Sequence, residues 1–495
     1  MKNVTFSETL KLDLVDSIIV VAYEDGRGFA EDKLREVFDK VLPKRMQEAT
    51  KDLGYAKIES FDISLSGRVV EIVVAGAGRK DMASRASMEK LGGYIFNHIR
   101  SKDAHVCLMN SVEMVGIEAA SAYLASGILL KSWIFDKYKT AKKPPKIKSM
   151  ECQTSYTEIN RNAFEDLSKV AEGVFAVRSM VTEPANVMTP EQIVEEAVKL
   201  KKLGVKVTVL DAKDLAKLEM NALLAVAQGS DRNSYVVAME YKAEKDMPPV
   251  ALVGKGITFD AGGLSLKPSK DMWRMKMDMT GAAVVIGTLK TLALKKSRTN
   301  VVGVIGIAEN VISGRAQRPG DVVVSMSKKT IEVDNTDAEG RLILADVLWY
   351  TKERFSPQAI VDFATLTGAI QIALGHEYAG LFSNSDELSS QLMASSEYVG
   401  EKLWRLPLHP SYASDIKSDI ADVKNTGCGR GAGSITAAMF LKEFVGEGTK
   451  WAHLDIAATE WDDKVRALSG KGATGFGVRL MDDFIEKHYS RSKGD

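Results

Sequence analysis

Hydrophobic positions along the chain follow two patterns, short runs of consecutive apolar residues and longer amphipathic stretches. The runs at residues 16–23 (DSIIVVAY) and 68–76 (RVVEIVVAG) are rich in valine and isoleucine, which is typical of buried β-strands. Residues 31–54 lie between them and carry a polar pattern with helical spacing. The N-terminal part of the chain therefore predicts an α/β domain.

The same alternation continues through the rest of the chain. Strand-type runs occur at residues 206–210, 235–241, 249–254, 301–308, 359–366 and 453–458, with helical stretches between them. This order predicts a mostly parallel central sheet with helices on both faces. Thr189, Pro190 and Gln192 predict the start of a helix with a capping box, in which Thr189 is the N-cap and Gln192 the third helical residue.

A Lys-rich segment at residues 136–148 contains two adjacent prolines and marks the best domain boundary. Residues 160–180 follow it with the pattern of a long amphipathic helix. We therefore expect a smaller N-terminal α/β domain at 1–148, a linker and connecting helix at 149–182, and a larger C-terminal catalytic domain at 183–495. The lysines of this segment are interpreted as solvated linker residues, with a nucleic-acid contact as the alternative.

Composition narrows the class of protein. The 495 residues include 66 Lys plus Arg and 66 Asp plus Glu, so the formal net charge is zero, which argues against a surface built for nucleic acid or anionic membrane. Cys107, Cys152 and Cys428 are far apart and form no C-x-x-C pair, which suits a reducing compartment. The apolar run at 17–23 is too short and too late for a signal peptide. No run approaches the roughly 20 apolar residues of a membrane span. We expect a cytoplasmic protein.

Candidate catalytic residues gather in two segments, 250–283 and 333–348, where strand patterns end. In open α/β sheets, active sites lie beyond the carboxyl ends of the strands. The first segment also contains a Gly262–Gly263 pair, which lets backbone approach a ligand closely. The charged residues that these segments contribute are Lys255, Asp260, Lys267, Asp278, Asp337, Glu339 and Arg341.

Four carboxylates in one site would repel one another, and some would stay protonated. Two divalent cations, about 3.5–4 Å apart, would neutralise them. Carboxylates suit Mg²⁺ and Mn²⁺ and also accept Zn²⁺. Lys255 could be a salt-bridge partner or, with a lowered pKa, a neutral amine ligand. Lys267 and Arg341 would supply positive charge where an oxyanion develops. The alternative for the second segment is a set of solvated charges on a surface helix.

Two longer motifs carry a resemblance to a known family. Residues 335–342 read NTDAEGRL, and residues 253–268 read VGKGITFDAGGLSLKP. From about residue 160 to the end, the chain closely resembles the cytosol, or leucyl, aminopeptidases, a family of dinuclear metallopeptidases. Further matching blocks lie at 183–190, 362–369, 425–441 and 451–457.

The resemblance implies a role for each matching residue. Asp260 and Glu339 would bridge the two metals, Lys255 and Asp278 would complete the tighter site, and Asp337 would complete the more exchangeable one. Lys267 and Arg341 match the two basic catalytic positions. The positions of Gly340, Arg341 and Leu366 imply a bicarbonate ion that acts as general base. The metals would be Mn²⁺ or Zn²⁺, with Mg²⁺ or Co²⁺ as further possibilities.

The resemblance also implies the reaction. A water that bridges the metals would attack the first peptide bond and release Leu and other, mostly apolar, N-terminal residues. The family assembles as homohexamers. The apolar substrate pocket would be lined by Met275, Thr365, Gly368 and Ala457. Glu460 stands where a small or apolar wall residue is common. If it points inward, it would favour an N-terminal Lys or Arg, and if it points outward it would have no such role.

Two other functions compete with this interpretation. A DNA-binding or scaffolding protein with secondary peptidase activity draws its support from the lysines at 137–148 alone. A two-metal phosphoesterase would share the carboxylate arrangement. A lysine ligand and the NTDAEGRL motif argue against the phosphoesterase.

Overall fold

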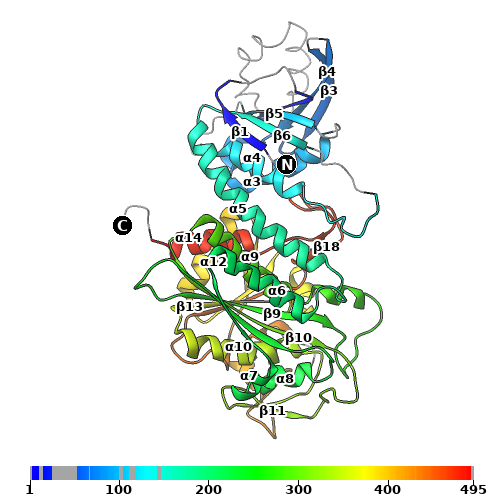
Figure 1. Ribbon diagram of the computed structural model, residues 1–495, viewed down its shortest axis with the longest axis vertical. Coiled ribbons are helices and arrows are strands. Elements are labelled where there is room, and N and C mark those ends of the chain that lie inside the picture. Colours follow the sequence, from blue (N-terminus) through cyan, green and yellow to red (C-terminus); the bar gives the residue numbers. More distant parts are fainter. Residues whose placement is uncertain are drawn as a thin grey trace. The chain divides into compact units, whose positions relative to one another are not determined.

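The computed structural model describes residues 3–9, 15–24, 53–65, 67–99, 104–110, 117–141, 147–427, 429 and 431–491. The chain forms two compact units, shown in Figure 1. The first comprises Met1–Ala171 and Lys464–Lys471, and the second comprises Glu172–Asp463 and Gly472–Asp495. Most of the helix predicted at 31–54, residues 142–146 of the Lys-rich segment with its two prolines, and Cys428 lie outside the described residues. The domain limits predicted from the sequence stay a prediction.

The first unit is built on a six-stranded sheet in the order β1-β6-β5-β2-β4-β3. Neighbouring strands are parallel except β3, which is antiparallel to β4. The runs predicted at 16–23 and 68–76 are β2 and β4, and every described residue of β2 is buried. The elements are β1 (Asn3–Ser7), β2 (Ser17–Ala22), β3 (Ile58–Leu65), β4 (Arg68–Gly76), a 3₁₀ turn (Lys80–Met82), α3 (Arg85–His98), β5 (Ala104–Asn110), α4 (Ala120–Lys131), β6 (Ile147–Gln153) and the first part of α5 (Thr157–Thr182).

The second unit contains an eight-stranded sheet in the order β15-β14-β17-β13-β9-β10-β8-β7. Its four central strands, β17, β13, β9 and β10, are parallel to one another. On one side β14 is antiparallel to β17 and parallel to β15, and on the other β8 is antiparallel to both β10 and β7. The strands are β7 (Lys206–Leu210), β8 (Tyr235–Lys242), β9 (Val250–Asp260), β10 (Asn300–Asn310), β13 (Ala359–Ala364), β14 (Ala379–Ser383), β15 (Leu403–Arg405) and β17 (Trp451–Asp455). Two small sheets consist of β11 (Val322–Val324), β12 (Thr330–Glu332) and β16 (Val423–Lys424), and of β18 (Trp461–Asp462) and β19 (Gly472–Ala473).

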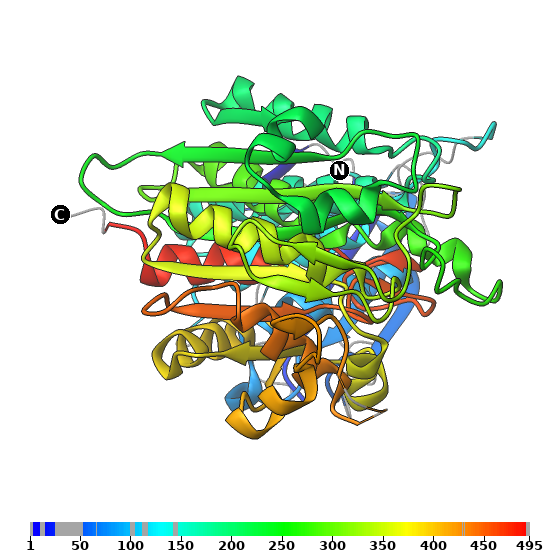
Figure 2. The ribbon, with the colours of Figure 1, turned by 90° about the horizontal axis from the view of Figure 1, so that it is seen from below.

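Helices cover both faces of this sheet, as Figures 1 and 2 show. On one face α9 packs on the central strands and on α14, and on the other α10 packs on β9, β10, α8 and α13. The mixed α/β fold with a mostly parallel central sheet is confirmed. The helices are α6 (Pro190–Val198), α7 (Ala212–Lys217), α8 (Asn221–Ala227), α9 (Thr280–Lys295), α10 (Glu339–Phe355), α11 (Gly368–Leu374), α12 (Asp386–Val399), α13 (Gly433–Lys442) and α14 (Val478–His488), with 3₁₀ turns at Lys199–Leu203, Met272–Met277 and Pro410–Ile416.

Two local expectations differ from the structure. Thr189 is the N-cap of α6 and Pro190 its first residue, but no side-chain hydrogen bond closes the predicted capping box. The amide of Gln192 donates to Glu195 instead. The helical run Met272–Lys295 also has the length and mean hydropathy, 1.3, of a membrane span. Of the most apolar 18 residues in this run, 83% are buried inside the protein, so the run has the character of a core helix.

The parallel centre of the sheet determines where the site forms. Carboxyl ends of parallel strands meet at one edge, so the residues that end them become neighbours. Strand β9 ends at Asp260, β10 at Asn310, and β17 at Asp455. Helix α10 begins at Glu339, directly after the loop that holds Asp337. The two candidate segments thus meet at one edge of the sheet.

Candidate active site

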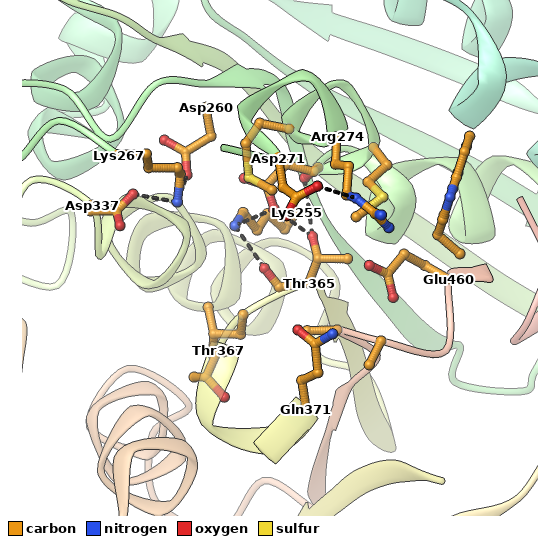
Figure 3. Close-up of a pocket in the computed structure, with 18 of the residues that line it drawn as sticks. Lys255, Asp260, Lys267, Asp271, Arg274, Asp337, Thr365, Thr367, Gln371 and Glu460 are labelled. Carbon is orange, nitrogen blue, oxygen red and sulfur yellow. Dashed lines mark hydrogen bonds and ion pairs between the residues drawn. The ribbon is translucent and has the colours of Figure 1, made fainter. Parts of the chain in front are cut away.

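A cavity of about 420 Å³ lies in the second unit at this edge of the sheet. Gly340 and Arg341 do not line it, whereas the other predicted site residues do. The lining residues are Lys255, Asp260, Lys267, Asp271, Arg274, Met275, Met277, Asp278, Asp337, Glu339, Thr365, Leu366, Thr367, Gly368, Gln371, His376, Ala457, Ala458, Glu460, Trp461 and Asp463. Ten of them are labelled in Figure 3.

Lys255 links the two candidate segments. Its Nζ lies 2.8 Å from Asp278 Oδ1 and 2.8 Å from Glu339 Oε1, and it donates to the carbonyl of Thr365 at 2.9 Å. Burial lowers the pKa of this ammonium, but the charges of Asp278, Glu339 and Asp260 outweigh burial and raise it. In this arrangement Lys255 is a salt-bridged cation, the first of the two roles considered from the sequence.

Lys267 makes a second bridge on the other side of the cluster. Its Nζ lies 2.8 Å from Asp260 Oδ2 and 2.5 Å from Asp337 Oδ1 (Figure 3). Asp260 is fixed further by two donors to its Oδ1, the backbone N–H of Gly262 at 2.9 Å and the Asn310 amide at 2.8 Å. The same Asn310 amide donates to the Thr336 carbonyl at 3.1 Å, which ties β10 to the loop before α10.

The carboxylates are better suited to a pair of divalent cations than to the two lysines alone. One oxygen each from Asp260, Asp337 and Glu339 lies within 4.8 Å of the others. Burial raises the pKa of Asp278 well above its ordinary range and that of Asp337 to about 7. Neighbouring carboxylates add to both shifts, because they oppose a further negative charge. Asp278 Oδ2 is buried without a hydrogen-bond partner. Hard oxygen donors of this kind are the ligands that divalent cations require.

A loop after β13 forms the facing wall. Thr365 donates from its hydroxyl to Asp278 Oδ1 at 2.6 Å. Asp455, which is fully buried, accepts from the backbone N–H of Leu366 at 3.1 Å and from the Thr367 hydroxyl at 2.7 Å. Asp455 thereby holds the loop whose carbonyl binds Lys255.

The backbone conformation and the close neighbours of positions 262 and 263 both require glycine there. Both residues have positive φ, +87° and +63°. A Cβ on Gly262 would lie 2.5 Å from the Ser265 carbonyl oxygen, and one on Gly263 would lie 2.9 Å from the Asn310 side chain. A side chain at either position would therefore push the Asp260 loop away from the cluster.

Of the three predicted bicarbonate residues, Leu366 lines the cavity and Gly340 and Arg341 do not. Arg341 is buried and donates from its guanidinium to the Asn425 carbonyl at 2.7 Å, while its Nε has no hydrogen-bond partner. Burial lowers the pKa of Arg341 to about 10, so it remains a cation at neutral pH. Gly340 lies against Lys255. A Cβ added to Gly340 would be 2.7 Å from the Cδ of Lys255. The Leu366 amide is already engaged by Asp455.

The predicted substrate pocket and Glu460 belong to the same cavity. Met275, Thr365, Gly368 and Ala457 line it, and so does Glu460. The glutamate is 4% exposed, and Figure 3 shows its carboxyl group directed toward Thr365. Of the two orientations considered from the sequence, the inward one is observed.

Sequence reasoning missed three residues that position this site, Asn310, Thr336 and Asp455. Asn310 ends β10 and lies two residues beyond the predicted run 301–308, so the rule that functional groups follow parallel strands could have found it. Asp455 ends β17 but lies inside the predicted run 453–458, so that rule did not single it out. Thr336 lies inside the NTDAEGRL motif, and its hydroxyl donates to the Gly262 carbonyl at 2.7 Å. Nothing in its pattern distinguished it from its charged neighbours.

Comparisons with known proteins show what this chain is similar to. A family model described as "Cytosol aminopeptidase family, catalytic domain" matches residues 175–481. A "probable cytosol aminopeptidase" of Rickettsia rickettsii is 47% identical over 432 residues, 86% of each chain. Its counterpart in Rickettsia canadensis is 46% identical over 434 residues, 86% of this chain and 87% of its own. The solved structure "Bottromycin maturation enzyme BotP in complex with Mn" has a TM-score of 0.82 and 30% identity, and the match covers 96% of this chain and 99% of that one.

Proposed function

Because the chain belongs to the cytosol aminopeptidase family and is therefore a metallo-exopeptidase, we propose that it releases N-terminal residues from peptides by a two-metal mechanism. The observation that carries this proposal is the convergence of five side chains at one sheet edge. These side chains are Lys255, Asp260, Asp278, Asp337 and Glu339.

The five side chains have the donors for two divalent cations. Asp260 and Glu339 would bridge the pair, Lys255 and Asp278 would complete one site, and Asp337 would complete the other. When bound, the cations would lower the pKa of a coordinated water and attract the carbonyl and free amine of the substrate. Manganese or zinc are the proposed metals, and the manganese in the BotP structure supports this choice.

The remaining charged residues act on the substrate. Lys267 is held by Asp260 and Asp337, so its ammonium stays at a fixed place in the cavity. There it would stabilise negative charge on the scissile carbonyl oxygen. Arg341, with the backbone at Gly340 and Leu366, is the proposed holder of a bicarbonate ion that would serve as a base for proton transfer.

We also propose for this chain the cellular location and the subunit assembly of the family. The relatives' name supports a cytosolic location. We propose a homohexamer, which sedimentation equilibrium would report as six times the 54.0 kDa chain mass. The DNA-binding alternative gains no support from the family match. The Lys-rich segment on which it depends is only partly described.

Removal of metal tests the proposed function directly. Enzyme stripped with a chelator should lose hydrolysis of aminoacyl anilides and regain it with Mn²⁺ or Zn²⁺. A phosphate monoester, offered in parallel, should not be hydrolysed. Full anilide hydrolysis by metal-free enzyme would contradict the two-metal mechanism, and hydrolysis of the phosphate ester alone would favour the phosphoesterase.

A further inference from the structure

Glu460 is a buried carboxyl group that the proposed chemistry does not use. It lies between β17 and β18, lines the cavity and points toward Thr365 (Figure 3). Its Oε2 is buried without a hydrogen-bond partner. Leaving a buried acceptor without a partner is unfavourable, and more so when the group is charged. A group with that cost and that orientation is suited to a ligand that enters the cavity.

The cations of the cavity do not neutralise Glu460. Each of them is held by two other carboxyl groups: Lys255 by Asp278 and Glu339, Lys267 by Asp260 and Asp337, and Arg274 by Asp271 and Asp463. Within the part of the chain that the structure describes, no cationic side chain forms an ion pair with Glu460. A cation supplied from outside would therefore find an unpaired acceptor.

The state of the carboxyl group agrees with this arrangement. Burial raises the pKa of Glu460 to about 8, while hydrogen bonds from the backbone at Glu460 and Ala458 and the more distant charge of Arg274 act in the opposite direction. Near pH 7 the carboxyl is therefore mainly neutral without a closer cation. A bound cation would favour the ionised form, because an opposite charge within a few ångströms lowers a carboxyl pKa.

The surrounding wall suits a long side chain with a charged end. Met275, Ala457 and Trp461 line the same cavity as Glu460 and present apolar surface. Lysine and arginine bury their methylene stems on such surface while their charged ends reach a polar partner. A short or purely apolar side chain would leave the carboxyl without a partner.

We propose that Glu460 determines specificity, by accepting the ammonium or guanidinium group of a Lys or Arg residue at the substrate's N-terminus. This inference rests on the proposed aminopeptidase function. It changes the expected substrate class from mostly apolar to basic N-terminal residues.

A matched pair of substrates tests it. Norleucine has an unbranched apolar side chain that resembles the methylene stem of lysine but lacks the ammonium group. For the metal-loaded wild type, kcat/KM for the lysine anilide should exceed that for the norleucine anilide at least tenfold. Glu460→Gln, which keeps the shape and removes the charge, should lower this ratio at least tenfold. The ratio is independent of the fraction of active enzyme, so partial misfolding does not affect it.

The controls separate this inference from its premise. Asp463 is an acid of the same cavity with 60% of its side chain exposed, so Asp463→Asn should change the ratio less than threefold. An equal loss in that variant, or a wild-type ratio near one, overturns the inference. No turnover of either anilide would instead remove the aminopeptidase function itself. Inhibition of the wild type by free lysine and free norleucine gives the same comparison without any variant, and lysine should be the stronger inhibitor.

Discussion

At the scale of single residues, two carboxylates of the site are fixed by uncharged neighbours in addition to the lysines. Asn310 and Thr365 each hold one carboxylate through a hydrogen bond of 2.8 Å or less. Such outer contacts fix the orientation of a metal ligand, and their loss typically costs 10–100-fold in metal affinity or activity. Much of the precision of this site therefore depends on uncharged residues.

Asn310→Ala tests that claim. Without its amide, Asp260 loses one of the two donors to Oδ1. We expect roughly 10–100-fold weaker Mn²⁺ affinity, measured by metal titration, and a matching loss of activity at limiting metal. Asn384→Ala is the matched control. Asn384 directly follows β14, and its amide also holds backbone, at Thr449 and at Trp451, which begins β17 at the end of that strand opposite Asp455. Equal metal affinity in both variants would contradict a positioning role for Asn310.

At the scale of elements, close packing of α9 against the sheet places Asp278 and Lys255. Gly281, in the first turn of α9, lies against β13 and β9, and a Cβ there would lie 2.1 Å from the Phe363 carbonyl oxygen. Backbone cannot retreat as a flexible side chain can, so the helix itself would have to move. The site thus depends on a contact between two backbones as well as on its ligands.

Gly281→Ala should therefore destabilise the protein by about 2–3 kcal/mol, the range of an overpacked core. Gly314→Ala is the control, because no atom lies within 4 Å of its ideal Cβ. Its effect should stay within about 1 kcal/mol. Urea unfolding followed by circular dichroism measures both. If the two variants unfold at the same urea concentration, the close contact at Gly281 does not matter for stability.

The sequence predicted these elements better than it predicted their contacts. Apolar runs located β2, β4, β9 and β10, because a strand buried on both faces leaves a continuous hydrophobic signal. The capping box at Thr189 was wrong, because a side-chain hydrogen bond depends on rotamers that spacing does not determine. The seven charged candidates came from two segments where strand patterns end, and six of them line one cavity. Asn310 and Asp455 were missed, since a single polar residue at a strand end resembles many others.

At the scale of the whole molecule, the candidate chemistry belongs to the second unit. All residues that line the cavity come from the range Lys255–Asp463 of that unit. The central parallel strands bring distant segments to one edge, and the helices on both faces bury the sheet that holds them. We expect metal binding and stability to be linked, because ions that bind only the folded chain stabilise it by about 2.7 kcal/mol at a hundred times their Kd.

The central claim is that five side chains hold two cations, and metal stoichiometry tests it most directly. Metal-free wild type titrated with Mn²⁺ in a calorimeter should bind two equivalents per chain, and its melting temperature should rise with the added metal. Asp260→Asn removes the proposed bridging carboxylate, so it should lose at least one equivalent and nearly all activity while keeping the wild-type circular dichroism spectrum. Two equivalents and full turnover in Asp260→Asn would contradict the account.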